Sequence, residues 1–257
     1  MRVPLLLIAA LAVPPAARAW GQECRAQEPR EAKVDAQGAQ TLRVLAGAGS
    51  LRIVGEAGLS EVVVKAKACA HDPETLQSIR LLAHRSGSEV RVEAELPKGF
   101  SGIGTFYARL DLELRVPASL AADVEDSSGE AAVAGVASLR LRDSSGSIEV
   151  TDVKGEVWLR DGSGEIEVRN VGSLIIDDDG SGGIRASGVS GDVRIREDGS
   201  GEIDLRDVTG NVTVEDDGSG GIGVRNVGGD FIVRHAGSGS INYEGVKGRV
   251  DVPKHRR

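Results

Sequence analysis

Six aspartates recur at one fixed position in the second half of the chain, always two residues before a Ser-Gly pair: Asp126, Asp143, Asp161, Asp179, Asp198 and Asp217. Carboxylates repeated in this way can accept hydrogen bonds from the backbone N–H groups of their own turns. They can also bridge calcium, which takes several oxygen ligands. We expect capping, because one aspartate per repeat suits a local turn and the glycine-rich nonapeptide calcium repeat is absent. The sequence therefore predicts no metal site.

Other patterns that could support catalysis are weak. The chain contains no G-x-S-x-G, no H-E-x-x-H and no clustered His/Cys set. The run 218–223 matches G-x-G-x-x-G, but a strand follows it where a dinucleotide site requires a helix. An enzyme alternative stays open, namely a polysaccharide lyase or hydrolase that uses carboxylates beside Arg142, Arg160 and Arg196. Because active sites tend to interrupt a repeat and these columns are regular, we expect no catalytic residue, no cofactor and no enzyme activity.

The aspartates belong to a repeat marked by Ser-Gly pairs, whose spacing is 17, 18, 18, 19, 19 and 19 residues. The serines of these pairs are Ser128, Ser145, Ser163, Ser181, Ser200, Ser219 and Ser238. Self-similarity at a nearly constant period indicates a stacked architecture. No single repeat can bury its apolar side chains alone, whereas stacking buries all of them in one continuous core.

Each repeat predicts two strands and two turns. An apolar, polar, apolar alternation follows each Ser-Gly pair, as in Ile203-Asp204-Leu205, and a second alternation follows, as in Val212-Thr213-Val214. Between them lies a column of Gly, Asp or Asn, the residue types that tolerate a left-handed backbone. We therefore predict an all-β fold, a parallel right-handed β-solenoid of about seven two-stranded rungs with a repeat of 17–19 residues. An antiparallel sandwich ranks second, because it would not need the same residue type at the same place in consecutive units.

The repeat unit, for example Asp161-Gly162-Ser163-Gly164-Glu165-Ile166-Glu167-Val168, resembles the bacterial putative-adhesin family of β-strand-repeat proteins. The lead-in Arg115-Val116-Pro117-Ala118, with Asp123–Gly129 after it, is similar to that family too. The resemblance covers about half the chain strongly and the earlier part more loosely. It implies an adhesin-like protein, although the columns themselves demonstrate no adhesion.

Residues 20–120 predict an N-terminal β-rich cap with degenerate repeats, and residues 121–257 form the solenoid with a short basic tail. Strand-like runs occupy Thr41–Leu45, Leu51–Val54, Val62–Lys67, Val90–Glu95 and Leu110–Val116, and Asp72-Pro73-Glu74 can begin one short helix. A cap is needed because an open solenoid end exposes strand edges and core.

The first 19 residues predict a secretory signal peptide. Arg2 precedes an apolar run from Val3 to Val13, and Ala17-Arg18-Ala19 forms an A-x-A cleavage site. The run is too short for a transmembrane span. We expect a periplasmic or secreted protein, in which Cys24 and Cys69 form a disulfide, because the compartment is oxidising and the cysteine count is even.

The net charge of −8 argues against a nucleic-acid surface. Trp158 should face outward, in a column with Ile175, Arg194, Thr213 and Ile232. Three interpretations are open: the N-terminal region covers this face, the face is a contact surface, or Trp158 is an ordinary exposed apolar residue. Of these we favour the last. The sequence thus favours a noncatalytic, adhesin-like or envelope-associated scaffold. Its partner would be an envelope or cell-surface component, with a glycan and a second copy of the chain among the candidates.

Overall fold

The computed structural model describes residues 24–97 and 107–253, which form twenty strands and one short helix. The predicted signal peptide, residues 1–19, lies outside the described residues, as do the last residues of the basic tail, 254–257. Within the described part of the chain no helix is long and apolar enough to cross a membrane.

The N-terminal elements are β1 (Ala26–Asp35), β2 (Thr41–Ala48), β3 (Leu51–Glu56), β4 (Glu61–Ala70), α1 (Pro73–Ser78), β5 (Arg80–Ser86), β6 (Glu89–Glu95) and β7 (Ala108–Pro117). The repeats supply β8 (Ala121–Ser128), β9 (Ala131–Ala134), β10 (Ser138–Arg142), β11 (Ile148–Asp161), β12 (Ile166–Asp179), β13 (Ile184–Val189), β14 (Val193–Asp198), β15 (Ile203–Val208), β16 (Val212–Ser219), β17 (Ile222–Val227), β18 (Phe231–Ser238), β19 (Ile241–Val246) and β20 (Val250–Asp251).

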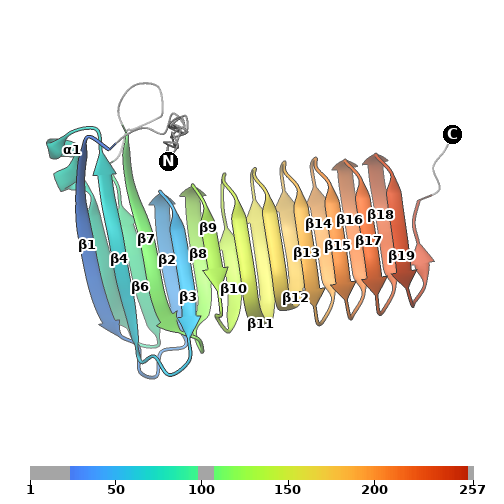
Figure 1. Cartoon of the computed structure of the whole chain (residues 1–257), viewed down its shortest axis with the longest axis horizontal. Coiled ribbons are helices and arrows are strands. Elements are labelled where there is room, and N and C mark those ends of the chain that lie inside the picture. The colour runs from blue at the N-terminus through green and yellow to red at the C-terminus, as the bar shows by residue number, and fades with distance from the viewer. Residues whose placement is uncertain (1–23, 98–106, 254–257) are drawn as a thin grey trace, which may run out of the picture.

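The repeats stack as a parallel β-solenoid with two sheet faces, as predicted (Figure 1). Face A contains β8, β10, the second halves of β11 and β12, and then β14, β16, β18 and β20. Face B contains β9, the first halves of β11 and β12, and then β13, β15, β17 and β19. Each strand pairs in parallel with the equivalent strand of the next rung, so the rungs keep one register.

The register confirms the predicted inward columns. Ile166, Ile184, Ile203 and Ile222 pair in succession along face B, and all four are buried. The matching apolar residues of face A are also buried, so that one core cluster runs through the stack between the two faces. Stacking therefore supplies the burial that no single rung could achieve.

The predicted turn column adopts the left-handed backbone at every rung. Four of its members are not glycine, namely Asp152, Asn170, Asp207 and Asn226, and their φ angles lie between 56° and 58°. Asn170 also donates from Nδ2 to Oδ1 of Asp152 at 3.1 Å, and Asn226 does the same to Asp207 at 2.8 Å. Short polar side chains tolerate this conformation and here also connect neighbouring rungs.

At the opposite corner, each Ser-Gly glycine lies directly against the backbone of the preceding rung. Gly182 has φ 148° and its N–H donates to the carbonyl of Ser200 at 2.9 Å. A Cβ atom on Gly182 would lie 1.5 Å from the carbonyl oxygen of Gly164. Only glycine fits at such a position, which explains why this half of the Ser-Gly pair recurs without exception.

The N-terminal strands extend both faces but not in chain order. On face B, β3 pairs with β9 on one side and with β7 on the other, and β4 and β1 follow as antiparallel strands. On face A, β2 lies between β8 and β6, and antiparallel β5 forms the edge. After β1 the chain forms β2 and β3, continues outward through β4, β5, β6 and β7, and then returns to β8 beside β2 (Figure 1).

The predicted short helix is present in this N-terminal region. Asp72 caps it by accepting from the N–H of Thr75 at 2.8 Å, and Pro73 occupies the first turn. Leu76 and Ile79 are buried.

The last rung differs from the others, because no described rung lies beyond it. Tyr243 occupies an inward column whose other members are buried, but it is 51% exposed. Its ring packs against Phe231 with 6.0 Å between centroids. Position in the repeat sets the direction of a side chain, whereas burial also requires a neighbouring rung.

The inward column can be tested at Ile203. Its replacement by alanine deletes a fully buried branched side chain and should lower the free energy of unfolding by about 2–5 kcal/mol. The adjacent exposed residue provides the control, since Glu202→Ala should change that free energy by less than about 0.5 kcal/mol. Equal effects of the two changes in chemical denaturation would contradict the assigned faces.

Neighbouring glycines test the close approach at the Ser-Gly corner. Gly182→Ala would force a Cβ into the backbone of the preceding rung at positive φ, and we expect a loss of more than about 3 kcal/mol. Gly183→Ala meets its nearest atom at 3.8 Å and should stay within about 1 kcal/mol of the wild type. Thermal unfolding of both variants measures the difference, and a mild Gly182→Ala would refute the steric account.

Candidate functional site

The outer surface of face A carries a stripe formed by the central outward residue of each rung. We call it the outer stripe, and it contains Arg140, Trp158, Ile175, Arg194, Thr213 and Ile232, which pair in register in that order. The sequence predicted the outward direction and the order of five of these side chains, from Trp158 to Ile232, and the structure adds Arg140. The N-terminal strands do not cover the stripe, because β2 and β6 extend the same sheet.

Trp158 is the aromatic member of this stripe. The guanidinium carbon of Arg140 lies 4.0 Å from the centroid of the indole ring, and that of Arg142 lies 5.4 Å away. Such cation–π contacts fix the ring and leave it half-buried on an outer face. Ile175 stands beside Trp158 on the next rung, so the two form a small apolar surface and Trp158 is not isolated.

A hollow of about 550 Å³ continues the stripe toward the C-terminus. Ile175, Thr213 and Ile232 line it together with Arg194. Polar residues from the start of each strand complete the lining: Glu156, Ser173, Asp192, Asn211 and Asp230. The hollow therefore combines apolar contact area with hydrogen-bond donors and acceptors.

The three arginines of the enzyme alternative lie beside this stripe, on the open sheet face. Each is held in an ion pair across or along the strands: Arg142 with Asp123 at 3.4 Å, Arg160 with Asp178 at 2.9 Å and Arg196 with Asp177 at 2.6 Å. Cross-strand ion pairs of this kind are ordinary on an exposed sheet surface.

The structure places the six repeated aspartates inside the solenoid, where the sequence analysis had assigned them only to turns. We call this set the aspartate column. Exposure ranges from 0% for Asp179 to 7% for Asp143. Burial raises the pKa of Asp126 and of Asp161 to about 6, because a charged carboxylate loses its solvation inside the stack.

The first three members cap their turns as predicted. Oδ1 of Asp126 accepts from the N–H of Ser127 at 2.8 Å, and Oδ1 of Asp143 accepts from Ser144 at 2.7 Å. Asp161 accepts from the N–H of Ser163 at 3.3 Å. In these rungs the capping hypothesis is confirmed.

The last three members, Asp179, Asp198 and Asp217, do not follow that prediction. Neither carboxylate oxygen of Asp179 or Asp198 has a hydrogen-bond partner, and Oδ1 of Asp217 has none either. The difference arises from one extra residue. Leu159 and Asp161 are separated by one residue, whereas Ile176 and Asp179 are separated by two, which produces a β-bulge between β11 and β12. This insertion is visible in the sequence, so the sequence could have distinguished the first three aspartates from the last three.

We found no group of three or more His, Cys, Asp or Glu side chains arranged to hold a metal ion within residues 24–97 and 107–253. His235 contacts the carbonyl of Glu215 through Nδ1 at 3.3 Å.

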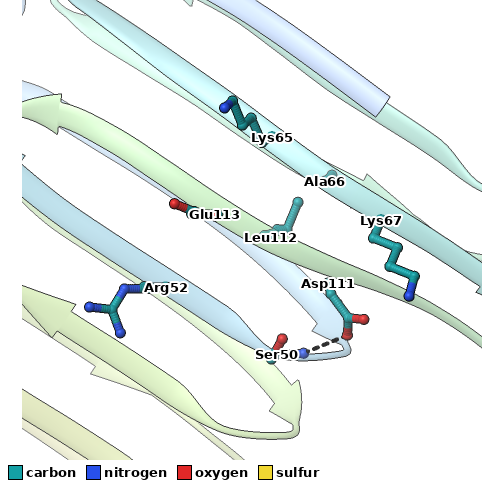
Figure 2. A pocket seen from close by; sticks show the side chains of 8 residues that line it. All are labelled: Ser50, Arg52, Lys65, Ala66, Lys67, Asp111, Leu112 and Glu113. Carbon is teal, nitrogen blue, oxygen red and sulfur yellow. Dashed lines mark hydrogen bonds between the residues drawn. The ribbon is translucent and has the colours of Figure 1, made fainter. Parts of the chain in front are cut away.

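A second hollow, of about 330 Å³, lies on face B among the N-terminal strands β3, β4 and β7 (Figure 2). It is lined by Ser50, Arg52, Lys65, Ala66, Lys67, Asp111, Leu112 and Glu113. Lys65 lies opposite Glu113 and Lys67 opposite Asp111, so opposite charges face each other across β4 and β7. Asp111 also accepts from the N–H of Ser50 at 3.1 Å. The sequence analysis missed this hollow, because only the inverted strand order brings β3, β7 and β4 side by side.

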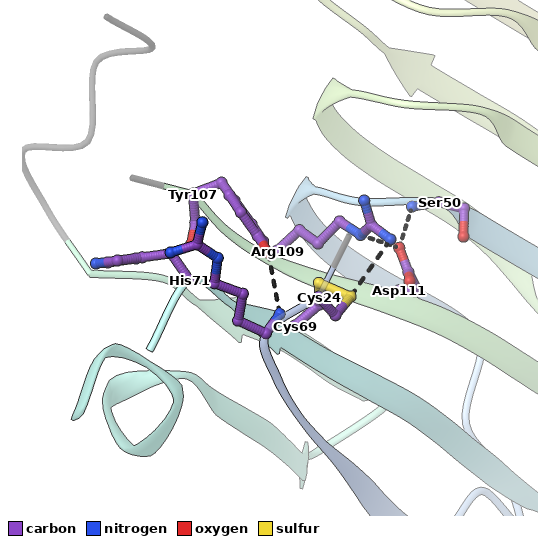
Figure 3. The surroundings of a disulfide bond; sticks show 8 residues. Cys24, Ser50, Cys69, His71, Tyr107, Arg109 and Asp111 are labelled. Atoms are coloured by element: carbon purple, nitrogen blue, oxygen red, sulfur yellow. Dashed lines mark hydrogen bonds and ion pairs between the residues drawn. A yellow bond between two sulfur atoms is a disulfide. The ribbon is translucent and has the colours of Figure 1, made fainter. Parts of the chain in front are cut away.

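Cys24 and Cys69 lie within disulfide distance near the C-terminal end of β4, with 5.4 Å between their Cα atoms (Figure 3). Cys69 is fully buried, and Arg109 contacts Sγ of Cys24 at 3.8 Å. The bond would tie the residues before β1 to the C-terminal end of β4. It would hold β1 to its neighbour β4.

Comparisons with known proteins agree with this architecture. No protein-family model matches the chain, and no curated protein matches it. A solved structure of a putative adhesin from Bacteroides fragilis superposes with a TM-score of 0.54 at 11% identity, covering 86% of this chain and 98% of that one. A putative adhesin from Parabacteroides merdae gives a TM-score of 0.45 at 13% identity, covering 89% and 96%. A putative lipid binding protein from Parabacteroides distasonis gives 0.43 at 15%, covering 89% and 97%. The first likeness shows that this fold also occurs in a protein described as an adhesin.

The cysteine pairing yields a prediction that rests on export through the predicted signal peptide. Mass spectrometry of nonreduced periplasmic material should show one peptide pair linked through Cys24 and Cys69, on a chain that begins at Trp20. Loss of the bond in Cys69→Ser should lower stability by about 2–4 kcal/mol, because the closed loop restricts the unfolded chain. Two thiols that react with an alkylating reagent in that material would contradict the pairing.

Proposed function

We propose that this chain is an exported, noncatalytic, adhesin-like binding protein that uses the outer stripe of face A to contact an envelope or cell-surface component. The observation that carries the proposal is Trp158. Its ring is fixed by two arginines on an uncovered sheet face, with Ile175 beside it. A rigid, partly exposed indole provides much contact area at a low entropic cost.

The partner class that fits the stripe is a surface glycan. Sugars present apolar ring faces together with many hydroxyl groups. Trp158 and Ile175 offer apolar surface, and Asn211, Thr213 and Asp230 in the adjoining hollow offer groups that bond to hydroxyls. The rungs repeat at the strand spacing of about 4.8 Å, which suits an extended polymer better than a small compact ligand.

Two further lines support the proposal. The fold is shared with a protein described as a putative adhesin. Export would follow from the predicted signal peptide, and a periplasmic or surface location would permit the disulfide.

A binding experiment with matched variants tests the function. Wild-type protein should bind one or more components of a glycan array or of isolated envelope fractions, and Trp158→Ala should weaken that binding at least tenfold, because stacking contacts of an anchor residue are lost. Leu82→Ala is the control, since Leu82 is a large apolar residue, 37% exposed, on the distant strand β5. Its binding should equal that of the wild type.

Turnover assays on the same glycans distinguish the enzyme alternative. We expect no release of reducing ends and no unsaturated product. Chain cleavage that depends on Arg160 or Arg196 would overturn the noncatalytic assignment, and equal binding by wild type and Trp158→Ala would remove the stripe from the proposal.

A further inference from the structure

Asp179, Asp198 and Asp217 form the C-terminal triplet of the aspartate column, and they stack directly on one another. Asp179 pairs in register with Asp198, and Asp198 with Asp217, on the parallel strands β12, β14 and β16. Parallel neighbours lie about 4.8 Å apart, so carboxyl groups on consecutive rungs can contact each other. On the next rung Ala236 occupies the position, so the column ends at Asp217.

The triplet is sealed from solvent and lacks partners. Its members are 0%, 3% and 2% exposed, and five of their six carboxylate oxygens have no hydrogen-bond partner. In the N-terminal half of the column, backbone N–H groups of Ser127, Ser144 and Ser163 supply a donor to one oxygen of each carboxylate, and only the other oxygen is left without a partner. The triplet must obtain donors from another source, because an isolated buried carboxylate is very costly.

Charged groups around the triplet do not provide compensation. Asp161 on β11 lies in register with Asp179, and it adds negative potential together with Asp178 on β12 and Asp216 on β16. Glu197 on β14 is exposed, Arg196 is paired with Asp177, and His235 on β18 lies opposite Asp216 with its ring at the carbonyl of Glu215. On the strands that follow each turn, β13, β15 and β17, the first side chains are the buried isoleucines Ile184, Ile203 and Ile222. Three carboxylates in this place would repel one another without a counter-charge.

We infer that the triplet is a proton-binding site, in which a protonated carboxyl group of one rung donates to the carboxylate of the next, so that the C-terminal rungs close fully only with protons bound. Each shared proton supplies a donor to an oxygen that otherwise has none, and it removes one of the repelling charges. Short carboxyl–carboxylate hydrogen bonds of this type are stronger than neutral ones.

Electrostatics agree with this assignment. Burial, with the charges of Asp179 and Asp217 added, raises the pKa of Asp198 to about 7. Burial raises the pKa of Asp179 to about 6 and raises that of Asp217 as well. Because the three groups interact, their protons belong to the triplet and not to one residue.

The sign of the pH dependence follows. An unfolded aspartate has a pKa of 3.8, so between that value and about 7 the folded triplet holds more protons than the unfolded chain. The stabilisation is complete below the unfolded pKa and is lost as the pH rises through the folded values. Asp204, Glu56 and Asp72 have lowered pKa values, so their stabilisation is lost only as the pH falls below about 4. Between about pH 5 and 8 the aspartate column should therefore determine how the free energy of unfolding changes with pH.

The first test needs no variant. Carbon-13 NMR of the full mature protein labelled in aspartate should show Asp179 titrating near pH 6 and Asp198 near pH 7, with Asp217 also above the exposed aspartates. Hydrogen exchange, corrected for the intrinsic rate, should become faster in β12, β14 and β16 between about pH 5.5 and 8 while β2 and β3 stay protected. Titration of all aspartates at ordinary values would overturn the inference.

Variants provide the second test. Asp198→Asn cannot ionise and its amide can donate to either neighbour, so the fall in melting temperature between about pH 5.5 and 8 should shrink by at least half. Glu197→Gln removes the same charge at the adjacent exposed position and should keep the wild-type fall. If Asp198→Asn does not fold, Asp217→Asn at the end of the column replaces it, and the NMR titration stands by itself.

Calcium chloride and a chelator complete the experiment. If protons are the ligand, neither calcium chloride nor the chelator should change the melting temperature. A calcium-dependent rise that Asp198→Asn abolishes would assign the site to a metal and overturn the inference.

Discussion

The structure depends on one contact, the approach of each Ser-Gly corner to the backbone of the next rung. The N–H of Gly146 donates to the carbonyl of Ser163 at 2.9 Å, and that of Gly164 donates to Ser181 at 2.8 Å, and the series continues along the stack. This line of hydrogen bonds holds the rungs at strand spacing, and only then do the inward columns of the two faces meet side chain on side chain. Without a Cβ at the corner, the backbone itself forms one edge of the solenoid. The buried core, the left-handed turns and the stacked carboxyl groups are all possible because the corner repeats so closely.

Much of the repeat region could be predicted from the sequence, because its signals are local. The alternation in Ile203-Asp204-Leu205 sets which side chains enter the core, and a Gly, Asp or Asn column marks the left-handed turn. These signals act within one rung and recur in the next, so an error in one repeat is corrected by the others. Trp158 was assigned to the outer face by the same argument, and the register confirmed its neighbours.

Three features could not be predicted in that way. The position of β2 and β3 between the first repeat and β6 and β7 depends on pairing between distant segments, which no local pattern records. The burial of Asp179, Asp198 and Asp217 depends on the direction of side chains near a bulge, where an extra residue such as Asp177 changes the phase of alternation. The hollow beside Trp158 arises from the sizes of residues on five successive rungs, so it is a property of the stack and not of any motif.

The inverted strand order at the N-terminus has a consequence for how the chain reaches its fold. Arg43 and Asp123 pair across 80 residues, whereas each later rung contacts residues only 17–19 positions away. Closing the long loop costs more chain entropy than adding a rung, and folding rates fall as the sequence separation of contacts grows. We therefore expect assembly of the N-terminal unit to limit the rate, with β8 and β9 docking on it as a template. The rungs that follow can then add quickly in chain order, each completing an edge that the previous one left open.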